Sequence, residues 1–383
     1  MTLFNILKFF AKGNKSLFDI EVETQKAFIN HLGGPKNDFD RSYKQYQCQN
    51  IFIPKWKIYL FDFTFFFINP FLILYYLCKG IRVVFERHVE AIASMPLDMQ
   101  LFPEEISEEY KIEDKQWSNT PTLRWKDLPF VLNLYRRGFF HPFFVGKCVS
   151  MVAIYSTMIH KFQPKALLAH CEFSFSCSLL TSFCQTNNVL HINTMHGEKL
   201  FVIRDAYVRF HRFYVWDIHY VALFTSMMGD EEQFIVFTPK SLTIDCSQYI
   251  DESFYADFKY YLAVFSESEL QNIVDSMNRL IKRGATVAYR PHPRYSDLTL
   301  LRKYVPEELI EKPQEVSIQQ SIANSKHAIG SYTTVLNQAA CSDRGVVLDD
   351  VAFKEQYEKL QQVNYILTRK SSVRLSKLLN DFD

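Results

Sequence analysis

Glycine-rich phosphate-binding motifs are missing from this sequence. It holds 11 glycines in 383 residues, and neither GxGxxG nor GxxxxGKS/T occurs in it. The first motif binds dinucleotides in Rossmann domains, and the second is the P-loop of nucleoside triphosphatases. We therefore expect neither dinucleotide chemistry nor P-loop chemistry.

Signals for a metal site are missing as well. The sequence has no HExxH, no DxD in a predicted strand-end loop, and no CxxC among its 8 cysteines. The spacing of Cys171, Cys177 and Cys184 fits no common zinc site, which predicts ordinary buried thiols. We expect no metal, no other cofactor and a reducing compartment.

A strong net charge is also lacking. The formal charge is +1, so no overall field attracts the chain to nucleic acid, and we expect no nucleic-acid partner. The apolar patch within residues 1–15 is followed by no small-residue cleavage site. This favours a cytoplasmic protein over a secreted one.

One long apolar run does occur, at residues 58–78. Asp62, Asn69 and Pro70 interrupt it, and each is costly inside hydrocarbon. We therefore predict a buried strand, turn and helix. The alternative is a peripheral contact at the inner face of the cytoplasmic membrane, because basic residues flank an aromatic surface. These residues are Lys55, Lys57, Lys79 and Arg82.

Apolar strands alternate with amphipathic helices in both halves of the chain, which predicts parallel βαβ units. We expect an α/β protein of two Rossmann-like domains facing a central cleft. The N-terminal domain is expected at 1–240 and the C-terminal domain at 255–383. Residues 97–122 are expected to form an exposed, irregular insertion. The predicted strands are 164–170, 189–197, 212–217, 260–266, 285–289, 327–330 and 346–350.

The sequence RPHPR follows one of these strands. Proline fixes its own φ and restrains the residue before it, so His292 has little backbone freedom between Pro291 and Pro293. Arg290 and Arg294 flank it, and guanidinium groups favour phosphate or carboxylate. Because ligands bind at the carboxyl ends of parallel strands, we predict an anion site here. A plain exposed turn is the alternative.

The sequence GSYTT follows another predicted strand and precedes a helix. Gly330, Ser331, Thr333 and Thr334 would place hydroxyl and backbone N–H groups at a helix N-terminus, which suits an anion. Ordinary helix capping is the alternative. Together with RPHPR, this loop predicts a phosphate pocket with two walls.

The loop NTMHGEKL follows a strand of the N-terminal half. His196 is a candidate base for a hydroxyl proton, and Glu198 would orient it or act as the base itself. Gly197 would allow a backbone conformation, or a close approach of another group to the backbone, that a side chain would block. Glu172, at the end of the preceding strand, is a second candidate carboxylate. A structural histidine is the alternative for His196.

Together with Gly197, three further residues are predicted to line the cleft at the same edge, or to contact the molecule whose hydroxyl His196 would deprotonate. They are His170, Trp216 and Asp217, and Asp217 is also placed to cap the next helix.

The segment 258–350, with His292-Pro293 and the downstream Ser331, Thr333 and Thr334, resembles the nucleotide-binding half of bacterial GT-B glycosyltransferases. It is most similar to the CMP-sialic acid-dependent sialyltransferases, whose HP and Ser/Thr motifs bind the cytidine monophosphate of the donor. The acidic-acidic-glycine motif of those enzymes is absent. Met195-His196-Gly197 stands at the comparable strand end, and similar His-Gly loops occur in capsule and teichoic-acid polymerases.

The resemblance implies an inverting, metal-independent sialyltransferase-like enzyme. It would move a sugar of sialic acid or Kdo type from a CMP-activated donor to a hydroxyl of a bacterial surface glycan, such as O-antigen, capsule or lipooligosaccharide. Two alternatives stay open. One is a transferase of polyol phosphate from a CDP-linked donor, and the other is a non-catalytic protein that binds a glycan or nucleotide.

Overall fold

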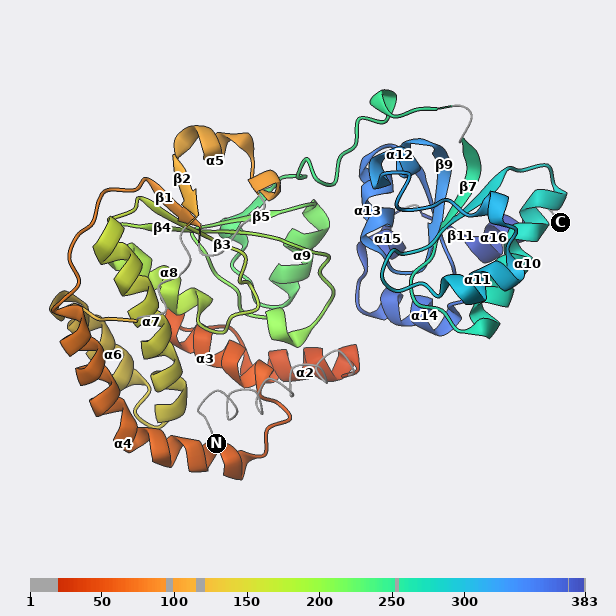
Figure 1. The fold of residues 1–383 in the computed structure, drawn as a ribbon. Coiled ribbons are helices and arrows are strands. Elements are labelled where there is room, and N and C mark those ends of the chain that lie inside the picture. The colour runs from red at the N-terminus through yellow and green to blue at the C-terminus, as the bar shows by residue number, and fades with distance from the viewer. Residues whose placement is uncertain (1–19, 94–98, 115–120, 252–254, 371, 382–383) are drawn as a thin grey trace. The chain divides into compact units, whose positions relative to one another are not determined.

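The computed structural model describes residues 20–93, 99–114, 121–251, 255–370 and 372–381. The chain divides into two compact units, Met1–Phe237 and Thr238–Asp383. Each unit is built on its own parallel sheet flanked by helices (Figure 1). The predicted α/β class with two Rossmann-like domains is therefore confirmed. The predicted N-terminal boundary at 240 falls close to the observed division. The apolar patch at residues 1–15, used above in predicting a cytoplasmic protein, lies outside the described residues.

Unit 1 has a six-stranded sheet of order β2-β1-β3-β4-β5-β6. All neighbouring strands in it are parallel. The strands are β1 (Ala91–Ala93), β2 (Ile112–Asp114), β3 (Ala166–Ala169), β4 (Leu190–Thr194), β5 (Arg212–Val215) and β6 (Phe234–Val236). The helices are α2 (Val22–Leu32), α3 (Asp38–Gln49), α4 (Lys55–Gly80), α5 (Glu104–Glu109), α6 (Leu128–Arg137), α7 (Pro142–Phe162), α8 (Cys177–Thr186) and α9 (Ile218–Ser226).

The sheet of unit 1 is covered on both faces. Successive side chains of a strand point to opposite faces, so Leu167 joins the core beneath α7 and α8 while Leu168 joins a second core beneath α5. Strands buried on both faces have continuous apolar sequences, and β3, with the sequence ALLA, is an example. The prediction of strands at 164–170, 189–197 and 212–217 is confirmed by β3, β4 and β5.

The prediction of an exposed insertion at 97–122 is wrong for the part of this range that the structure describes. Strand β2 extends the sheet. Helix α5 packs against the sheet through Ile106, and the residues Phe102 and Tyr110 on either side of the helix are buried in the same core. The many acidic residues here lie on the outer side of a short helix. Because they dominate the sequence of this segment, they suggested full exposure, although three apolar residues among them are buried. Residues 97–98 and 115–120 lie outside the described residues.

The prediction of a strand, turn and helix at 58–78 is also wrong, because these residues belong to the single helix α4. Pro70 lies inside it, and α4 curves around the outside of α6 and α7 (Figure 1). Proline removes one backbone hydrogen bond, and helices bend at such positions. The interrupting polar groups face inward, since Asn69 donates to the backbone oxygen of Pro142 at 2.8 Å and Asp62 accepts from the Phe143 N–H at 2.9 Å.

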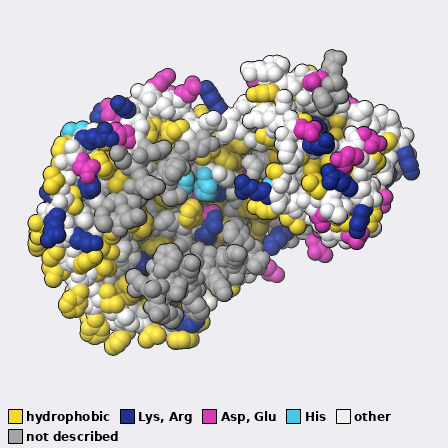
Figure 2. Space-filling model, in the orientation of Figure 1, with side chains coloured by type: hydrophobic (Ala, Val, Ile, Leu, Met, Phe, Trp, Pro, Cys, Tyr) yellow, Lys and Arg dark blue, Asp and Glu magenta, His cyan; other side chains and the backbone are white. Residues whose placement is uncertain are grey.

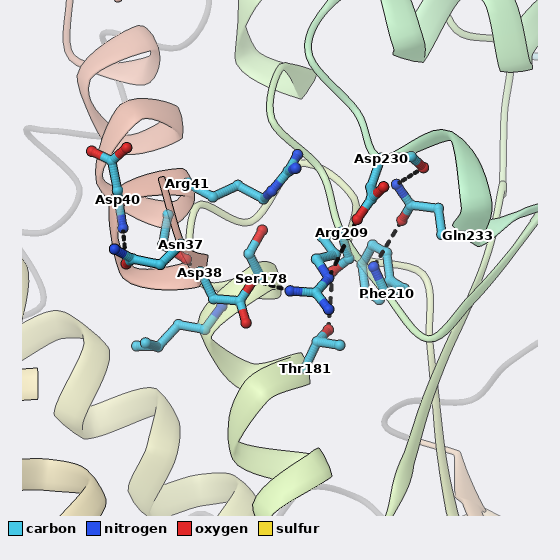
Figure 3. Close-up of polar contacts among 12 residues, drawn as sticks. Asn37, Asp38, Asp40, Arg41, Ser178, Thr181, Arg209, Phe210, Asp230 and Gln233 are labelled. Atoms are coloured by element: carbon cyan, nitrogen blue, oxygen red, sulfur yellow. Dashed lines mark hydrogen bonds and ion pairs between the residues drawn. The ribbon is translucent and has the colours of Figure 1, made fainter. Parts of the chain in front are cut away.

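A polar cluster ties α3 to the amino edge of the unit 1 sheet (Figure 3). Arg209, which precedes β5, forms an ion pair with Asp38 at the start of α3, and its backbone oxygen accepts from Thr181 Oγ1 at 3.0 Å. Arg41 donates to the backbone oxygen of Met228 at 2.6 Å. These contacts hold α3 in a fixed place, which matters because the far end of α3 reaches the opposite edge of the sheet.

Unit 2 has a five-stranded sheet of order β11-β10-β9-β7-β8, also parallel throughout. The strands are β7 (Ala256–Tyr261), β8 (Val287–Arg290), β9 (Ser325–Gly330), β10 (Gly345–Leu348) and β11 (Val373–Arg374). The helices are α10 (Glu267–Lys282), α11 (Leu298–Tyr304), α12 (Ile318–Ala323), α13 (Thr334–Cys341), α14 (Lys354–Gln362), α15 (Ile366–Arg369) and α16 (Leu375–Asn380).

The sequence signals of unit 2 are mostly confirmed. Helix α10 begins with a capping box of Ser266 and Glu269, and Gly284 after it has a φ of 85°, which favours glycine. The predicted strand at 260–266 is shifted, because β7 ends at Tyr261. The apolar residues after it form a strand-end loop, and Val264 in this loop is 68% exposed.

Gly80 at the end of α4 gives a test of how this helix is held. A Cβ built at Gly80 would lie 1.8 Å from the backbone oxygen of Leu123. We expect Gly80→Ala to lower the free energy of unfolding by about 1–3 kcal/mol, because a backbone oxygen cannot move aside as a flexible side chain can. Urea unfolding measures this.

Gly34→Ala is the matched control, since a Cβ there meets nothing within 4 Å and the φ of Gly34 is not positive. Equal stabilities of the two variants would contradict the close approach at Gly80.

Candidate functional site

The candidate residues of unit 1 follow three adjacent strands. Loops leave the carboxyl ends of β3, β4 and β5, which are neighbours in the sheet. Glu172 comes from the first loop, His196 from the second and Trp216 from the third. In open parallel sheets this edge is where ligands bind. The prediction that these loops share one edge is therefore confirmed, whereas their roles stay predictions.

Glu172 is a fully buried carboxylate with several partners. Lys199 forms an ion pair with its Oε1, and Asn193 Nδ2 donates to its Oε2 at 3.2 Å. Gln45, from the end of α3, donates to its backbone oxygen at 3.1 Å. Burial alone would raise the pKa of this carboxyl, but the charge of Lys199 and the hydrogen bond with His196 bring it well below its usual range. The partners of Glu172 thus favour its charged form.

His196 lies on the open side of this carboxylate. Its Nδ1 is 3.4 Å from Glu172 Oε1, and its side chain is 38% exposed while that of Glu172 is 0% exposed. A carboxylate beside Nδ1 favours the tautomer with its proton on that nitrogen, which leaves Nε2 to accept a proton from outside. The geometry therefore gives the two residues different capacities: His196 can exchange protons with a ligand, and Glu172 orients it.

His170 stands next to His196, with ring centroids 5.0 Å apart. Burial, followed by the neighbouring His196, lowers the pKa of His170. A neutral imidazole here avoids placing a second positive charge beside His196. His170 is therefore placed as a neutral polar group at this edge, which fits the predicted contact with an acceptor.

The remaining candidates of unit 1 have more structural contacts. Glu198 accepts a hydrogen bond from Tyr220 Oη at 2.8 Å, which turns it toward α9. Asp217 caps α9 by accepting from the His219 N–H at 2.8 Å, as predicted. Trp216 is buried beside Tyr220. Gly197 has no positive φ, and a Cβ there would meet nothing within 4 Å, so the expected backbone requirement for glycine is not observed.

In unit 2, the RPHPR loop positions His292 through its backbone. The His292 N–H donates to Ser296 Oγ at 2.8 Å, and that hydroxyl donates to the backbone oxygen of Ala263 at 2.9 Å. The Arg294 N–H donates to His292 Nδ1 at 3.1 Å, so this nitrogen is an acceptor and the proton of the neutral ring is on Nε2. Tyr295 stacks on the ring with a centroid distance of 4.5 Å. His292 is thus prepared to donate a hydrogen bond from Nε2.

Arg290 does not share this orientation. Its side chain is 8% exposed and donates to Glu311 Oε1 at 2.5 Å and to the backbone oxygen of Val316 at 2.9 Å. Lys259 contacts the other oxygen of Glu311 at 2.5 Å. Arg290 therefore belongs to a buried charged triad with Glu311 and Lys259, and its predicted phosphate contact stays a prediction. Arg294 and Pro293 are exposed at the loop tip.

The GSYTT loop follows β9, whose neighbour is β7. Thr333 caps α13 by accepting from the Val335 N–H, and Ser331 Oγ donates to Gln356 Oε1 at 2.6 Å. Thr334 is exposed in the first turn. Gly330 lies in a tight place, because a Cβ there would lie 3.3 Å from the backbone oxygen of Tyr261. The capping alternative is thus observed, and it leaves the helix N-terminus open to an anion.

A pocket of about 160 Å³ lies against this loop. Three segments line it: the end of β7 with the residues that follow, the GSYTT loop, and the start of α14 with Phe353 before it. These lining residues include Ala263, Val264, Phe265, Ser331, Thr333 and Gln356. The backbone oxygen of Ala263 also fixes Ser296, so the pocket and the His292 loop share one anchor. The RPHPR and GSYTT loops follow β8 and β9, which lie on either side of β7 in the sheet of unit 2.

Sequence reasoning missed the partners that define the Glu172 centre. Lys199, Asn193 and Gln45 were not singled out. Lys199 was visible three positions after His196, in the same loop. Gln45 carried no signal, because it comes from a helix 127 positions earlier in the chain. Among the described residues, no three His, Cys, Asp or Glu side chains gather as a metal site would require, and all eight cysteines are free thiols.

No protein-family model and no curated protein matches this sequence. Among solved structures, the chain is similar to the UDP-GlcNAc 2-epimerase from Methanocaldococcus jannaschii, with 11% identity, 77% of this chain and 91% of that one covered, and a TM-score of 0.44. It is also similar to the glycosyltransferase of kitacinnamycin, with 9% identity, coverage of 76% and 89%, and a TM-score of 0.45. A third is the wall teichoic acid polymerase TagF, H444N variant, with 9% identity, coverage of 81% and 82%, and a TM-score of 0.40. Likeness at this level assigns no activity to this chain.

The buried pair of Glu172 and Lys199 gives a second test. We expect Glu172→Gln to lower the free energy of unfolding by about 3–5 kcal/mol, because it leaves the Lys199 ammonium buried without its counter-charge. Chemical denaturation followed by circular dichroism measures the change.

The control is Glu23→Gln, which removes one partner of the exposed pair with Lys26 and is expected to cost less than about 1 kcal/mol. If both variants lose equally little, Glu172 does not hold the loops of unit 1 together.

Proposed function

We propose that the chain is an inverting, metal-independent glycosyltransferase of the GT-B type, with a CMP-activated sugar of sialic acid or Kdo type as donor. The acceptor would be a hydroxyl of a bacterial surface glycan such as O-antigen, capsule or lipooligosaccharide. The observation that carries the proposal is the exposed His196 backed by the buried anion of Glu172, at the ligand-binding edge of a parallel sheet. Such a pair suits the removal of a proton from an alcohol.

In this proposal, unit 1 supplies the base. His196 Nε2 accepts the proton of the acceptor hydroxyl while the oxygen attacks the anomeric carbon. Glu172 holds the ring by Nδ1 and stabilises the imidazolium that forms. Attack opposite the departing phosphate in a single displacement inverts the anomeric centre. The bond between the anomeric carbon and the phosphate oxygen breaks, and CMP leaves with the electron pair.

Unit 2 would bind the leaving group. His292 Nε2–H, the hydroxyl of Thr333 and the N-terminus of α13 would donate hydrogen bonds to a phosphate, and Ser331 would join them by exchanging its hydrogen bond to Gln356 for one to the phosphate. Donors directed at the oxygen where charge develops lower the barrier most, and they do so without a metal. The pocket beside Ser331 and Thr333 has apolar walls that suit a pyrimidine base. Arg294, exposed at the loop tip, adds a positive charge.

A second reaction fits the same residues. A histidine takes the place where sialyltransferases carry a carboxylate base, and His-Gly loops of this kind occur in polymerases that use CDP-linked polyols. There the acceptor hydroxyl, deprotonated by His196, would attack phosphorus rather than an anomeric carbon, and CMP would again leave. The two reactions differ in the nucleotide part of the donor, which is CMP for the sugar and CDP for the polyol.

Nucleotide binding tests the role of unit 2. We expect CMP or CDP to raise the melting temperature and UDP and GDP to do so less, since a ligand bound only to the folded state stabilises it by about 2.7 kcal/mol at 100 times its Kd. His292→Ala is expected to weaken the cytidine nucleotide at least tenfold. His88→Ala, an exposed histidine in unit 1, is the control.

A stronger shift with CMP favours sugar transfer, and one with CDP favours transfer of a polyol phosphate. A larger shift with UDP or GDP would overturn the cytidine donor, and no shift with any nucleotide would overturn the transferase.

Turnover tests the role of unit 1. We expect His196→Ala to slow CMP release from CMP-sialic acid or CMP-Kdo by about 10²–10⁴-fold while the affinity for CMP is unchanged, because a general base acts on the reaction and not on nucleotide binding. Glu172→Gln variants that fold should show a smaller loss and an altered pH profile. A His196→Ala variant with unchanged turnover would leave a binding protein as the better description.

A further inference from the structure

Among the described residues, two helices are long and apolar enough to cross a membrane, and they differ sharply in how far the fold buries them. The apolar section of α7 has a mean hydropathy of 1.4 and is 78% buried, so it is the central helix of a core. The apolar section of α4 has a mean hydropathy of 1.7, yet only 6% of it is buried within the chain. Packing within the described residues therefore accounts for α7 and leaves most of α4 unexplained.

The exposed side of α4 forms a continuous apolar surface. Its large side chains recur at intervals of three or four residues, which is the spacing of one helix face. They are Trp56, Tyr59, Leu60, Phe63, Phe67, Phe71, Leu74 and Tyr75, each between 51% and 73% exposed. We call this set the α4 surface. Figure 2 shows hydrophobic side chains gathered over this region at the lower left.

The α4 surface continues onto the end of α6. The rings of Phe66 and Phe139 lie 5.6 Å apart, and those of Phe139 and Phe140 lie 5.4 Å apart. Phe140 is 83% exposed. Monomeric proteins rarely expose apolar patches of this extent unless the patch binds something.

Charge on the same segment is of one sign. Between Asn50 and Phe85 the only acidic residue is Asp62, which is turned inward to the Phe143 N–H. The basic residues lie toward the two ends of α4 and next to Phe139. They are Lys55, Lys57, Lys79, Arg82, Arg136 and Arg137. Aromatic rings with basic residues at their border match the interface of a bilayer that contains anionic lipid.

The inner side of α4 shows how the helix would lie. Asn69, Asp62 and Tyr76 all hydrogen-bond to α7, at 2.8, 2.9 and 3.2 Å. Gly146 of α7 allows the close approach, because a Cβ there would lie 2.5 Å from Phe65 and from Asn69. A helix that crossed the bilayer would have to break these bonds and expose the core beside α7. A helix that lies in the plane of the membrane keeps them all.

We propose that α4 is an in-plane membrane anchor, which inserts the α4 surface into the headgroup region of an anionic phospholipid bilayer while its inner side stays packed on α7. This inference rests on burial, ring positions and charge, and it does not depend on the transfer chemistry proposed above.

Vesicle binding of the full-length chain tests the proposal. Wild-type protein is expected to sediment with vesicles of phosphatidylcholine and phosphatidylglycerol, and more weakly with phosphatidylcholine alone. Phe67→Ser/Phe71→Ser should bind both kinds of vesicle at least tenfold more weakly. Ile250→Ser/Val373→Ser, which removes two exposed apolar side chains of unit 2, is the matched control and should bind like wild type.

A second variant separates the charge from the apolar surface. Lys55→Gln/Arg82→Gln should weaken binding to the anionic vesicles several-fold and leave binding to pure phosphatidylcholine unchanged. Melting temperatures near that of the wild type show that each variant is folded. If wild-type protein sediments with neither kind of vesicle, the proposal is overturned. So does a stable dimer in light scattering that Phe67→Ser/Phe71→Ser converts to a monomer, since a second copy would then cover the surface.

Discussion

Much of unit 1 depends on one buried carboxylate. Burial disfavours the charged form of Glu172, so partners that donate hydrogen bonds or carry positive charge have to offset that cost. Lys199 and Asn193 do so from the loop and strand β4, and Gln45 joins the loop backbone from α3. Because α3 is itself fixed by the Arg209 and Asp38 pair at the opposite edge of the sheet, the loop that carries Glu172 is held by contacts that reach both edges. The exposed His196 is held in place by its contact with Glu172.

How much the sequence predicted depends on the range of the interactions involved. The strand-end loops were predictable because periodicity and turn residues are local, and the capping box of α10 and the loops around His196 and His292 were found in this way. The ion pair of Arg290 could not be predicted, because its partner Glu311 lies on a later segment that the short motif does not include. Lys199 and Gln45 were missed for the same reason. Which of several charged residues faces inward is decided by contacts between distant segments.

The two apolar helices show the same limit on a larger scale. The mean hydropathies of α4 and α7 are close, at 1.7 and 1.4, so hydropathy alone would predict α4 to be buried at least as deeply as α7. Their difference in burial arises only when α7 is covered by α8, the sheet and α4 itself. Asp62 and Asn69 suggested a break in the chain, whereas they are the groups that bind α4 to its neighbour. A polar residue in an apolar run can therefore mark a helix contact as readily as a turn.

The way α4 is held to α7 along its length has a kinetic consequence. A flexible tail would only tether a protein near a surface, and the attached domain would tumble. A helix fixed along one side of its domain passes its own orientation to the whole of unit 1, including the edge that carries His196. On a bilayer such a domain would keep one tilt and diffuse in two dimensions. Each encounter with a membrane-borne partner would then begin from the same approach direction, and productive collisions would become more frequent without any change in the site itself.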